Sequence, residues 1–415
     1  MKVKISHVDV INGEIKISGS KNAALPIIVS TLLTEEKVTL YNIPVIDDVL
    51  NLLKILKSIG SKIEFDYKKN KLTIINSNIN TNVANENVSK LRASYYLMGA
   101  LISSNKSMSI NFPGGCNFSS RPIELHLKAF KLLNIKININ KKITLKTNQL
   151  KSNDIYFPII SVGATINTIL SSVFIKGITT IYNASIEPEV IDTINFINSL
   201  GGNIKVLENR VIKIYGVTKL NGGCYKIMFD RIEAGSYLLL TSTRPNSKIK
   251  LLNVDYTKML STLQILKKIG CKINYNKNKI VLISPEQIRN VNIEVGPYPS
   301  IPTDLQPILS VVLLNGNKQS TIKDNIYSDR VSHIDELKKM NAEIMYNLDK
   351  IIINSSKLIG STVISHDLRC AFALIVASTM AKGITIIDKI DYIKRGYEKI
   401  EEKLNKLGIK LMSEN

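Results

Sequence analysis

Apolar and polar positions along the chain follow two alternating rhythms. In some stretches apolar residues recur every three or four positions, as on one face of a helix, and in the stretches that follow they alternate, as in a strand. A glycine or asparagine, which can cap a helix end, separates the two. This sequence of helix end, cap and strand recurs six times, in LKSIGSKIEF from Leu56, LLNIKININ from Leu132, NSLGGNIKV from Asn198, LKKIGCKINY from Leu266, LKKMNAEIMY from Leu337 and LNKLGIKLM from Leu404. The pattern predicts an α/β protein built from six similar βαβ-rich units.

Each unit is also expected to contain a second, more apolar helix. These helices begin in SKNAALPIIVSTLL, LRASYYLMGALI, SVGATINTILSSVF, DRIEAGSYLLLT, TDLQPILSVVLL and DLRCAFALIVAS. Because they are apolar along their whole length, we expect them to be buried, with strands and amphipathic helices outside them. Their expected starts are spaced by about 70 residues, at Lys21, Arg92, Ser161, Arg231, Asp304 and Arg369.

The apolar helices are expected to begin with polar or charged residues. A helix N-terminus carries unpaired N–H groups and partial positive charge, which favour a bound anion. Basic residues stand at four of these starts, namely Lys21, Arg92, Arg231 and Arg369. One arginine at a helix start can simply be solvated or paired, but the recurrence at equivalent positions points to an anionic ligand.

Composition and charge restrict the class of protein. The chain has 415 residues, of which 44% are hydrophobic, enough for two globular domains with large cores. No apolar run reaches the length of about 18 residues that a membrane span needs, and no signal-peptide core precedes the first strand, so we expect a cytoplasmic protein without membrane contact. The net charge of +21 invites a nucleic-acid partner. The lysines are dispersed among Ile and Asn rather than gathered in blocks, so we expect no nucleic acid.

The four cysteines form neither a C-x-x-C pair nor, with only four histidines, a plausible zinc pattern, so no metal and no disulfide framework is expected. Three of them are expected to be inert thiols, namely Cys224, Cys271 and Cys370. Cys116 is different. It lies in the glycine-turned segment NFPGGCNFSSRPIELHL with Arg121 nearby, which is typical of an accessible thiol with a tuned pKa.

Several motifs together carry a resemblance to a known family. They are SGSKNAALPI at 18–27, PGGCNFSSRPIELH at 113–126, SVGAT at 161–165, IEPEVIDT at 186–193, PTDLQ at 302–306, DLR at 367–369 and KRGYEKIEEKL at 394–404. In this order, and over essentially the whole chain, they closely resemble the enolpyruvyl transferases that act on UDP-N-acetylglucosamine.

The resemblance implies a two-domain inside-out α/β barrel. Residues 21–230 would form one domain, with the Cys116 loop as a lid, and residues 1–20 and 231–415 would form the other. The implied reaction moves the enolpyruvyl group of phosphoenolpyruvate to the 3′-hydroxyl of UDP-N-acetylglucosamine and releases phosphate, at the start of peptidoglycan precursor synthesis. The resemblance implies no metal and no cofactor, and no oligomeric state is predicted.

The resemblance also implies roles for individual residues toward phosphoenolpyruvate. The phosphate would be bound by Lys21, Arg121 and Arg395, and the carboxylate by Arg330 and Arg369, residue types that suit such anions. The matching thiol, that of Cys116, donates a proton to the methylene carbon, can attach to phosphoenolpyruvate, and is alkylated by fosfomycin.

For the hydroxyl proton, the matching base is Asp304. Because this residue stands at an expected helix start, it could equally be an N-cap, and its position alone does not separate the two roles. Asp367 is expected to orient arginines or to assist proton traffic rather than to act as the base.

The nucleotide sugar would be held by matching positions in several segments. Asn22 would contact the sugar, and Ile326 would contact the ligand through its backbone. The uridine end would be bound by Arg92 and by the segment of Arg121, Pro122, Ile123, Glu124 and Leu125. The diphosphate would be bound by Ser161, Val162 and Gly163. Many relatives have a lysine shortly before the SVGAT segment, whereas this chain has Ile159 and Ile160 there, which weakens a contact without changing the assignment.

Three alternatives remain open at this stage. The shikimate-pathway enolpyruvyl transferase shares the fold and the phosphate-binding logic, but the Cys116 loop, SVGAT and PTDLQ favour the uridine nucleotide. A basic nucleic-acid-binding protein would bind with a steep salt dependence and would leave Cys116 unexplained. A degenerate enzyme is the third alternative, although every residue needed for the chemistry is present.

Overall fold

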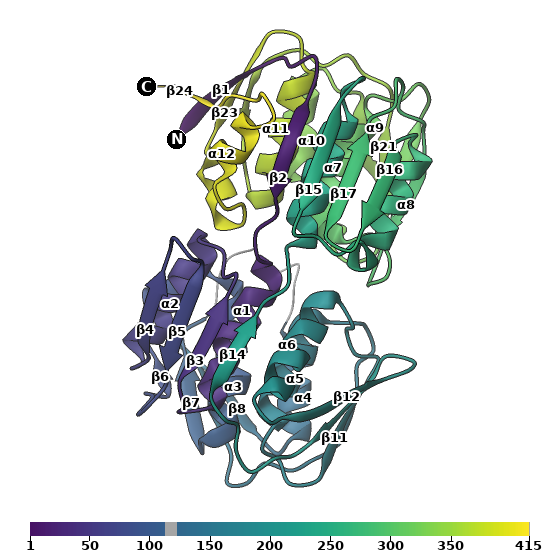
Figure 1. Cartoon of the computed structure of the whole chain (residues 1–415). Coiled ribbons are helices and arrows are strands. Elements are labelled where there is room, and N and C mark those ends of the chain that lie inside the picture. Colours follow the sequence, from purple (N-terminus) through teal and green to yellow (C-terminus); the bar gives the residue numbers. More distant parts are fainter. Residues whose placement is uncertain (113–122, 415) are drawn as a thin grey trace. The chain divides into compact units, whose positions relative to one another are not determined.

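The structure, a computed structural model, describes residues 1–112 and 123–414. The chain forms two compact units (Figure 1). We call Gly19–Met228 the central unit, and Met1–Ser18 together with Phe229–Asn415 the terminal unit. Among the described residues the strands form six four-stranded sheets, each with one parallel and two antiparallel pairings. The α/β fold class and the six-fold repetition predicted from the sequence are confirmed.

The sheets of the central unit have the strand orders β14-β3-β5-β4, β6-β7-β9-β8 and β10-β11-β13-β12. Their bounds are β3 (Val38–Tyr41), β4 (Lys62–Asp66), β5 (Lys71–Ile75), β6 (Asn82–Val83), β7 (Ser107–Ile110), β8 (Lys136–Ile139), β9 (Ile143–Lys146), β10 (Asp154–Tyr156), β11 (Ile178–Tyr182), β12 (Asn203–Leu207), β13 (Val211–Tyr215) and β14 (Gly223–Lys226).

The helices of the central unit are of two kinds. The apolar ones are α1 (Lys21–Ser30), α3 (Tyr96–Ser104) and α5 (Val162–Ser172), and nearly all their residues are buried. The amphipathic ones are α2 (Asp47–Ser58), α4 (Glu124–Leu132) and α6 (Pro188–Ser199), each with one buried face. Short 3₁₀ turns occur at η1 (Thr31–Leu33), η2 (Glu86–Lys90) and η3 (Arg92–Tyr95).

The terminal unit repeats this plan with the orders β16-β17-β15-β2, β18-β19-β21-β20 and β22-β23-β1-β24. Its strands are β1 (Lys2–Ser6), β2 (Asn12–Lys16), β15 (Lys248–Leu252), β16 (Lys272–Asn276), β17 (Lys279–Ile283), β18 (Asn292–Val295), β19 (Ser320–Asp324), β20 (Ile344–Asn347), β21 (Lys350–Ile353), β22 (Thr362–Ile364), β23 (Ile384–Asp388) and β24 (Met412–Glu414).

Apolar helices again form the core of the terminal unit. Every residue is buried in α7 (Arg231–Ser242), α9 (Gln306–Leu313) and α11 (Leu368–Met380). In Figure 1 the sheet that contains β15 and β17 covers α7. The amphipathic helices are α8 (Leu260–Lys268), α10 (Ser332–Lys339) and α12 (Ile400–Asn405), and the 3₁₀ turns are η5 (Tyr256–Met259), η6 (Thr303–Leu305) and η7 (Ile390–Arg395).

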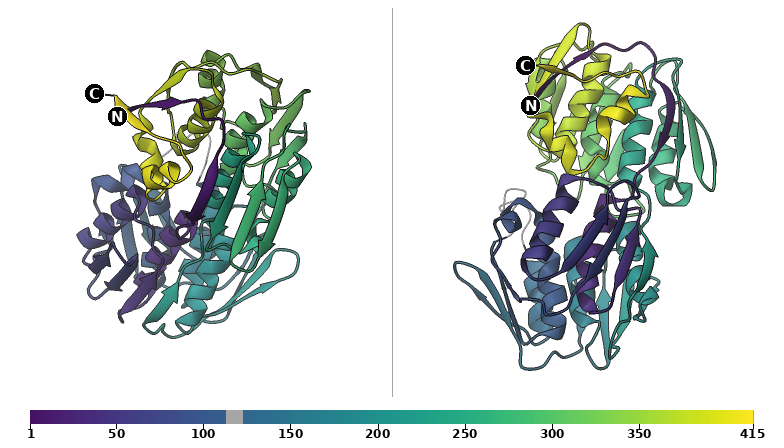
Figure 2. Two further views of the ribbon diagram at one scale, coloured as in Figure 1. Left: turned by 45° about the horizontal axis from the view of Figure 1, so that its top comes forward. Right: turned by 60° about the vertical axis from the view of Figure 1, so that its left-hand side comes forward.

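Both chain ends complete sheets of the terminal unit. Strand β2 pairs with β15 in parallel, and β1 lies between β23 and β24 and is antiparallel to both (Figure 2). In the central unit the last strand, β14, returns to pair in parallel with the first, β3. Each unit is therefore closed by strands that are distant in the sequence.

Several expected helix starts are displaced by a few residues. Arg92 lies in η3 and Asp304 in η6, so α3 and α9 begin later, at Tyr96 and Gln306. A 3₁₀ turn is a common first turn of a helix, and the apolar pattern cannot distinguish it from an α-turn. The predicted left-handed caps are confirmed at Asn134 (φ 65°) and Asn341 (φ 67°).

Among the helices that the structure describes, none combines the length and apolarity that crossing a bilayer requires.

Candidate active site

Two arginines of the terminal unit converge on one carboxylate. Asp304 Oδ1 accepts a hydrogen bond from Arg330 Nη1 at 2.7 Å, and Asp304 Oδ2 accepts one from Arg369 Nη2 at 2.6 Å. Burial disfavours the charged form of Asp304, but the charges of Arg369 and Arg330 and their hydrogen bonds outweigh burial and hold its pKa well below the usual 3.8. In this arrangement the carboxylate stays ionised and is a weak base.

The structure tests one of the two roles predicted for Asp304, that of an N-cap. Neither η6 nor α9 has a side chain bonded to its N-terminal N–H groups. The alternative of an N-cap at Asp304 is therefore wrong. The Asp304 carboxylate is bonded to Arg330 and Arg369 instead.

The N-cap occurs in the next repeat, at Asp367. Its Oδ1 accepts the backbone N–H groups of Arg369 (2.7 Å) and Cys370 (3.0 Å), and its Oδ2 accepts the hydroxyl of Ser332 (3.0 Å). Burial alone would raise the pKa of Asp367. The hydrogen bonds from these N–H groups and the charge of Arg330 outweigh burial, so the pKa lies below the usual 3.8. Asp367 thus fixes the backbone from which the Arg369 side chain projects.

Tyr397 supports Arg369 from the other side. Its hydroxyl lies 2.8 Å from Ser236 Oγ and accepts from Arg369 Nη1 at 3.3 Å, and its ring stacks on Phe372. Tyr397 lies two residues beyond Arg395, which ends η7 and is half-buried. Arg395 could be named from the KRGYEKIEEKL motif, whereas the contact of Tyr397, in the same motif, with Arg369 could not.

Lys21, in the central unit, is paired rather than solvated. It is the first residue of α1, whose cap is Ser20, and its Nζ lies 2.6 Å from Asp48 Oδ2. Asp48 is almost fully buried in the first turn of α2, so the ammonium group is held in place. Asn22 follows in the first turn of α1 and is half-buried.

The start of α5 has the geometry of an anion site. Ser161 is its N-cap and accepts from Ala164 N at 3.3 Å, and Val162 and Gly163 form the first turn. A Cβ atom at Gly163 would lie only 2.9 Å from the His126 ring, so only glycine fits against this imidazole. The ring is buried, and its Nδ1 lies 2.7 Å from Asn167 Nδ2.

Because the Asn167 amide nitrogen is a donor, Nδ1 of His126 is the acceptor and the proton of the neutral ring is on Nε2. Burial and the charge of Arg92 lower the pKa of His126 to about 3, so the ring remains neutral. The sequence analysis stopped at Leu125 and missed His126. The signal available was its place directly after the matched segment.

The remaining predicted residues lie in different surroundings. Arg92 is half-buried with its guanidinium 5.8 Å from the Tyr95 ring centroid, and Ile123, Glu124 and Leu125 form the entry to α4, half-buried or exposed. Ile326 is exposed, and its N–H donates to Asp324 Oδ1 at 2.9 Å. Cys116, Arg121 and Pro122 lie outside the described residues.

Two of the three cysteines expected to be inert, Cys271 and Cys370, are buried. Burial raises the pKa of Cys271 and of Cys370 to about 12, and Cys224 lies on the exposed strand β14. Within the part of the chain that the structure describes, no three His, Cys, Asp or Glu side chains gather to hold a metal ion.

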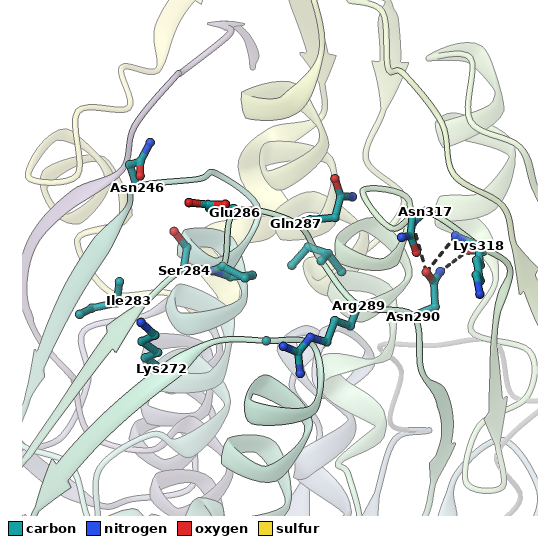
Figure 3. Close-up of a pocket in the computed structure, with 13 residues that line it drawn as sticks. Asn246, Lys272, Ile283, Ser284, Glu286, Gln287, Arg289, Asn290, Asn317 and Lys318 are labelled. Carbon is teal, nitrogen blue, oxygen red and sulfur yellow. Dashed lines mark hydrogen bonds between the residues drawn. The ribbon is translucent and has the colours of Figure 1, made fainter.

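A cavity of about 790 Å³ lies elsewhere in the terminal unit (Figure 3). Most of the residues that line it are polar, and they come from the loops around β16 and β17 and from Asn317 and Lys318. None of the thirteen residues that line it is a predicted site residue. The candidate chemistry is therefore assigned to the arginine cluster and to the start of α5, not to this cavity.

Comparison with known proteins connects these features to a family. The family described as EPSP synthase (3-phosphoshikimate 1-carboxyvinyltransferase) matches residues 5–404. A UDP-N-acetylglucosamine 1-carboxyvinyltransferase of Pelagibacter ubique is 38% identical over 414 residues, which cover 99% of each chain. Another, from Wolbachia pipientis of Culex pipiens, is 39% identical over 98% of this chain and 97% of its own.

Solved structures agree in fold at much lower identity. An enolpyruvyl transferase from Streptomyces tendae superposes with a TM-score of 0.91 at 17% identity and covers 99% of this chain and 98% of its own. An EPSP synthase from Acinetobacter baumannii superposes with a TM-score of 0.78 at 18% identity over the full length of both chains.

Proposed function

The chain belongs to the enolpyruvyl transferase family, and from this premise we propose that it transfers the enolpyruvyl group of phosphoenolpyruvate to the 3′-hydroxyl of UDP-N-acetylglucosamine, with release of phosphate. The observation that carries the proposal is the identity of 36–39% over nearly full length with relatives named for this reaction. This reaction is the first committed step of peptidoglycan precursor synthesis.

The carboxylate of phosphoenolpyruvate is assigned to Arg330 and Arg369. Their guanidinium groups already hold a carboxylate, that of Asp304, at 2.7 and 2.6 Å. Charge-assisted hydrogen bonds between a guanidinium group and a carboxylate are among the strongest that a protein makes with an anion. The phosphate is assigned to Lys21, Arg121 and Arg395, which supply the positive charge that a leaving phosphate requires.

Proton transfers accompany both the addition and the elimination stage of the reaction. The acceptor hydroxyl loses its proton to Asp304 as its oxygen bonds to C2 of the enol, and C3 gains a proton from the Cys116 thiol. In the second stage C3 returns a proton to the Cys116 thiolate, the bond from C2 to the phosphate oxygen breaks and the double bond is restored. The leaving phosphate takes up the proton held by Asp304. Atoms and charge balance without a redox step.

Most of the residues assigned to the nucleotide belong to the central unit, and Ile326 belongs to the terminal unit. The N-terminal N–H groups of α5, at Ser161 to Gly163, suit the diphosphate, and Asn22, Arg92, Ile326 and the segment 121–125 complete the binding set. The domain division into 21–230, with the Cys116 loop as a lid, and 1–20 with 231–415 is part of the proposal, and the two compact units support it.

The partners of the protein in this proposal are its two substrates, with no nucleic acid. We place the reaction in the cytoplasm, because both substrates are multiply charged anions that do not enter an apolar bilayer unaided.

The test is to incubate the purified protein with phosphoenolpyruvate and UDP-N-acetylglucosamine and to analyse the nucleotide sugar by mass spectrometry. We expect the sugar to gain one enolpyruvyl group, and an Arg369→Met variant to form much less product. An unmodified nucleotide sugar, after incubation with wild-type protein shown to be folded, would count against the assignment.

A further inference from the structure

The carboxylate of Asp304 fills the position that a substrate carboxylate would need. Each of its oxygens is bonded to a different guanidinium group, Oδ1 to Arg330 and Oδ2 to Arg369. A carboxylate has only two oxygens to offer such a pair of arginines. An incoming carboxylate cannot make the same two contacts while Asp304 makes them.

The two arginines do not depend on Asp304 for their placement. Arg330 Nη1 also donates to the carbonyl of Thr303 at 2.8 Å, and its guanidinium lies 5.3 Å from the Tyr327 ring centroid. Arg369 donates to the Tyr397 hydroxyl and lies 5.8 Å from the centroid of that ring. If the Asp304 carboxylate moved away, both guanidinium groups would keep an anchor.

Charge and exposure favour displacement of Asp304 rather than of the arginines. The Asp304 side chain is 20% exposed, against 10% for Arg330 and 9% for Arg369. The two guanidinium groups carry one positive charge more than Asp304 neutralises. Two further carboxylates interact with the arginines electrostatically, Asp367 with Arg330 and Asp230 with Arg369. Negative charge therefore stays near both arginines when Asp304 moves away.

We propose that Asp304 is an internal stand-in for the substrate carboxylate: phosphoenolpyruvate, on binding to Arg330 and Arg369, displaces the Asp304 carboxylate and so makes it available to accept the hydroxyl proton. This inference rests on the proposed function. It gives the reaction an order, because the base becomes effective only after the electrophile is in place.

The electrostatics of the site support this order. While both arginines are bonded to it, Asp304 is a weak base, since their charges strongly favour its ionised form. Once the substrate carboxylate takes over these contacts, the partial neutralisation of the arginines and the loss of two charge-assisted hydrogen bonds make Asp304 a stronger base. The acceptor hydroxyl is then deprotonated only when phosphoenolpyruvate is present to receive the oxygen.

The test compares the dissociation constant for phosphoenolpyruvate, without acceptor, in the wild type, Asp304→Ala, Asp304→Asn and a control, Asp335→Asn, by isothermal titration calorimetry. Asp335 is an exposed aspartate of α10 in the same unit, so its replacement changes the net charge equally. We expect Asp304→Ala to bind at least about tenfold more tightly than the wild type, because the competitor is gone. Asp304→Asn, which keeps the shape of the side chain, should bind more tightly by a smaller factor, and Asp335→Asn should bind as the wild type does.

Salt separates displacement from a general effect of charge. At about 0.5 M salt the screening length is only a few ångströms, so a long-range gain would vanish while a gain from direct competition would persist. Equal or weaker binding by both Asp304 variants, or a gain that disappears in salt, would overturn the inference. These outcomes leave the proposed function standing if the wild type still forms product, whereas absence of product from folded wild-type protein would contradict the function itself.

Discussion

Replacing Lys403 by methionine should destabilise the terminal unit strongly, because it leaves a carboxylate buried without its counter-ion. Lys403 Nζ lies 2.5 Å from Glu233 Oε1 and donates to Ser18 Oγ at 2.7 Å, and the two charged side chains are only 9% and 2% exposed. Without Lys403, Glu233 Oε2 still accepts a hydrogen bond from Ser18 N at 2.8 Å. Removing one partner of a buried ion pair costs roughly 3–5 kcal/mol.

The size of the unit converts this cost into a melting temperature. For a unit of about 200 residues, 1 kcal/mol corresponds to about 2–4 °C, so the melting temperature should fall by roughly 6–20 °C. The matched control is Lys406→Met, because Lys406 forms an exposed pair with Glu402 at 2.7 Å that should contribute at most about 1 kcal/mol. The chain has no tryptophan, so far-ultraviolet circular dichroism is the suitable probe.

The pH dependence gives a second, independent check. Burial raises the pKa of Glu233 even though Lys403 lowers it, and removal of Lys403 will raise it further. Because the folded state then holds a proton that the unfolded state has lost, the variant keeps its stability below the unfolded value near 4.5 and loses stability as pH rises toward the raised pKa. The deficit of Lys403→Met relative to wild type should therefore be smaller at about pH 5 than at about pH 8. A deficit no larger than that of Lys406→Met, or one independent of pH, would refute this reasoning.

Three further predictions concern single residues. His333 is fully buried, both of its ring nitrogens lack a partner among the described residues, and burial lowers its pKa to about 4. The free energy of unfolding should therefore fall by up to about 3 kcal/mol as pH falls from 6.5 toward 4. In urea unfolding, His333→Leu should show a weaker pH dependence over this range. Asp367→Ala should cost about 1 kcal/mol through loss of the α11 cap, whereas Asp367→Asn should keep most of the stability, and equal losses in thermal unfolding would contradict a capping role. Gly163→Ala should weaken UDP-N-acetylglucosamine binding in calorimetry because its Cβ meets the His126 ring, and adding His126→Ala should restore part of the affinity; no recovery would show that the clash is not the cause.

The repeated architecture was predictable because short sequence patterns determine where its helices end and its strands begin. Six helix ends with a glycine or asparagine cap and a following strand recur at a regular spacing, and the left-handed Asn134 and Asn341 show that the cap chemistry was interpreted correctly. The exact helix starts were not predictable, because a 3₁₀ first turn such as Arg92–Tyr95 has the same apolar pattern as an α-turn.

The sequence suggests candidate residues for the site but not the contacts between them. The arginine cluster joins residues from three segments, at 304, 330 and 369, and no local pattern records that both guanidinium groups bond to Asp304. For the same reason the capping role could not be assigned in advance to Asp367 rather than to Asp304. Partners that lie far away in sequence, such as Asp48 for Lys21, depend on how helices pack and are visible only in the fold.

The most direct test of the account is phosphate release from phosphoenolpyruvate by the purified protein, measured in parallel with UDP-N-acetylglucosamine, with shikimate 3-phosphate and without an acceptor. The account predicts release only with UDP-N-acetylglucosamine. Release with shikimate 3-phosphate, or none with any acceptor from folded protein, would contradict it.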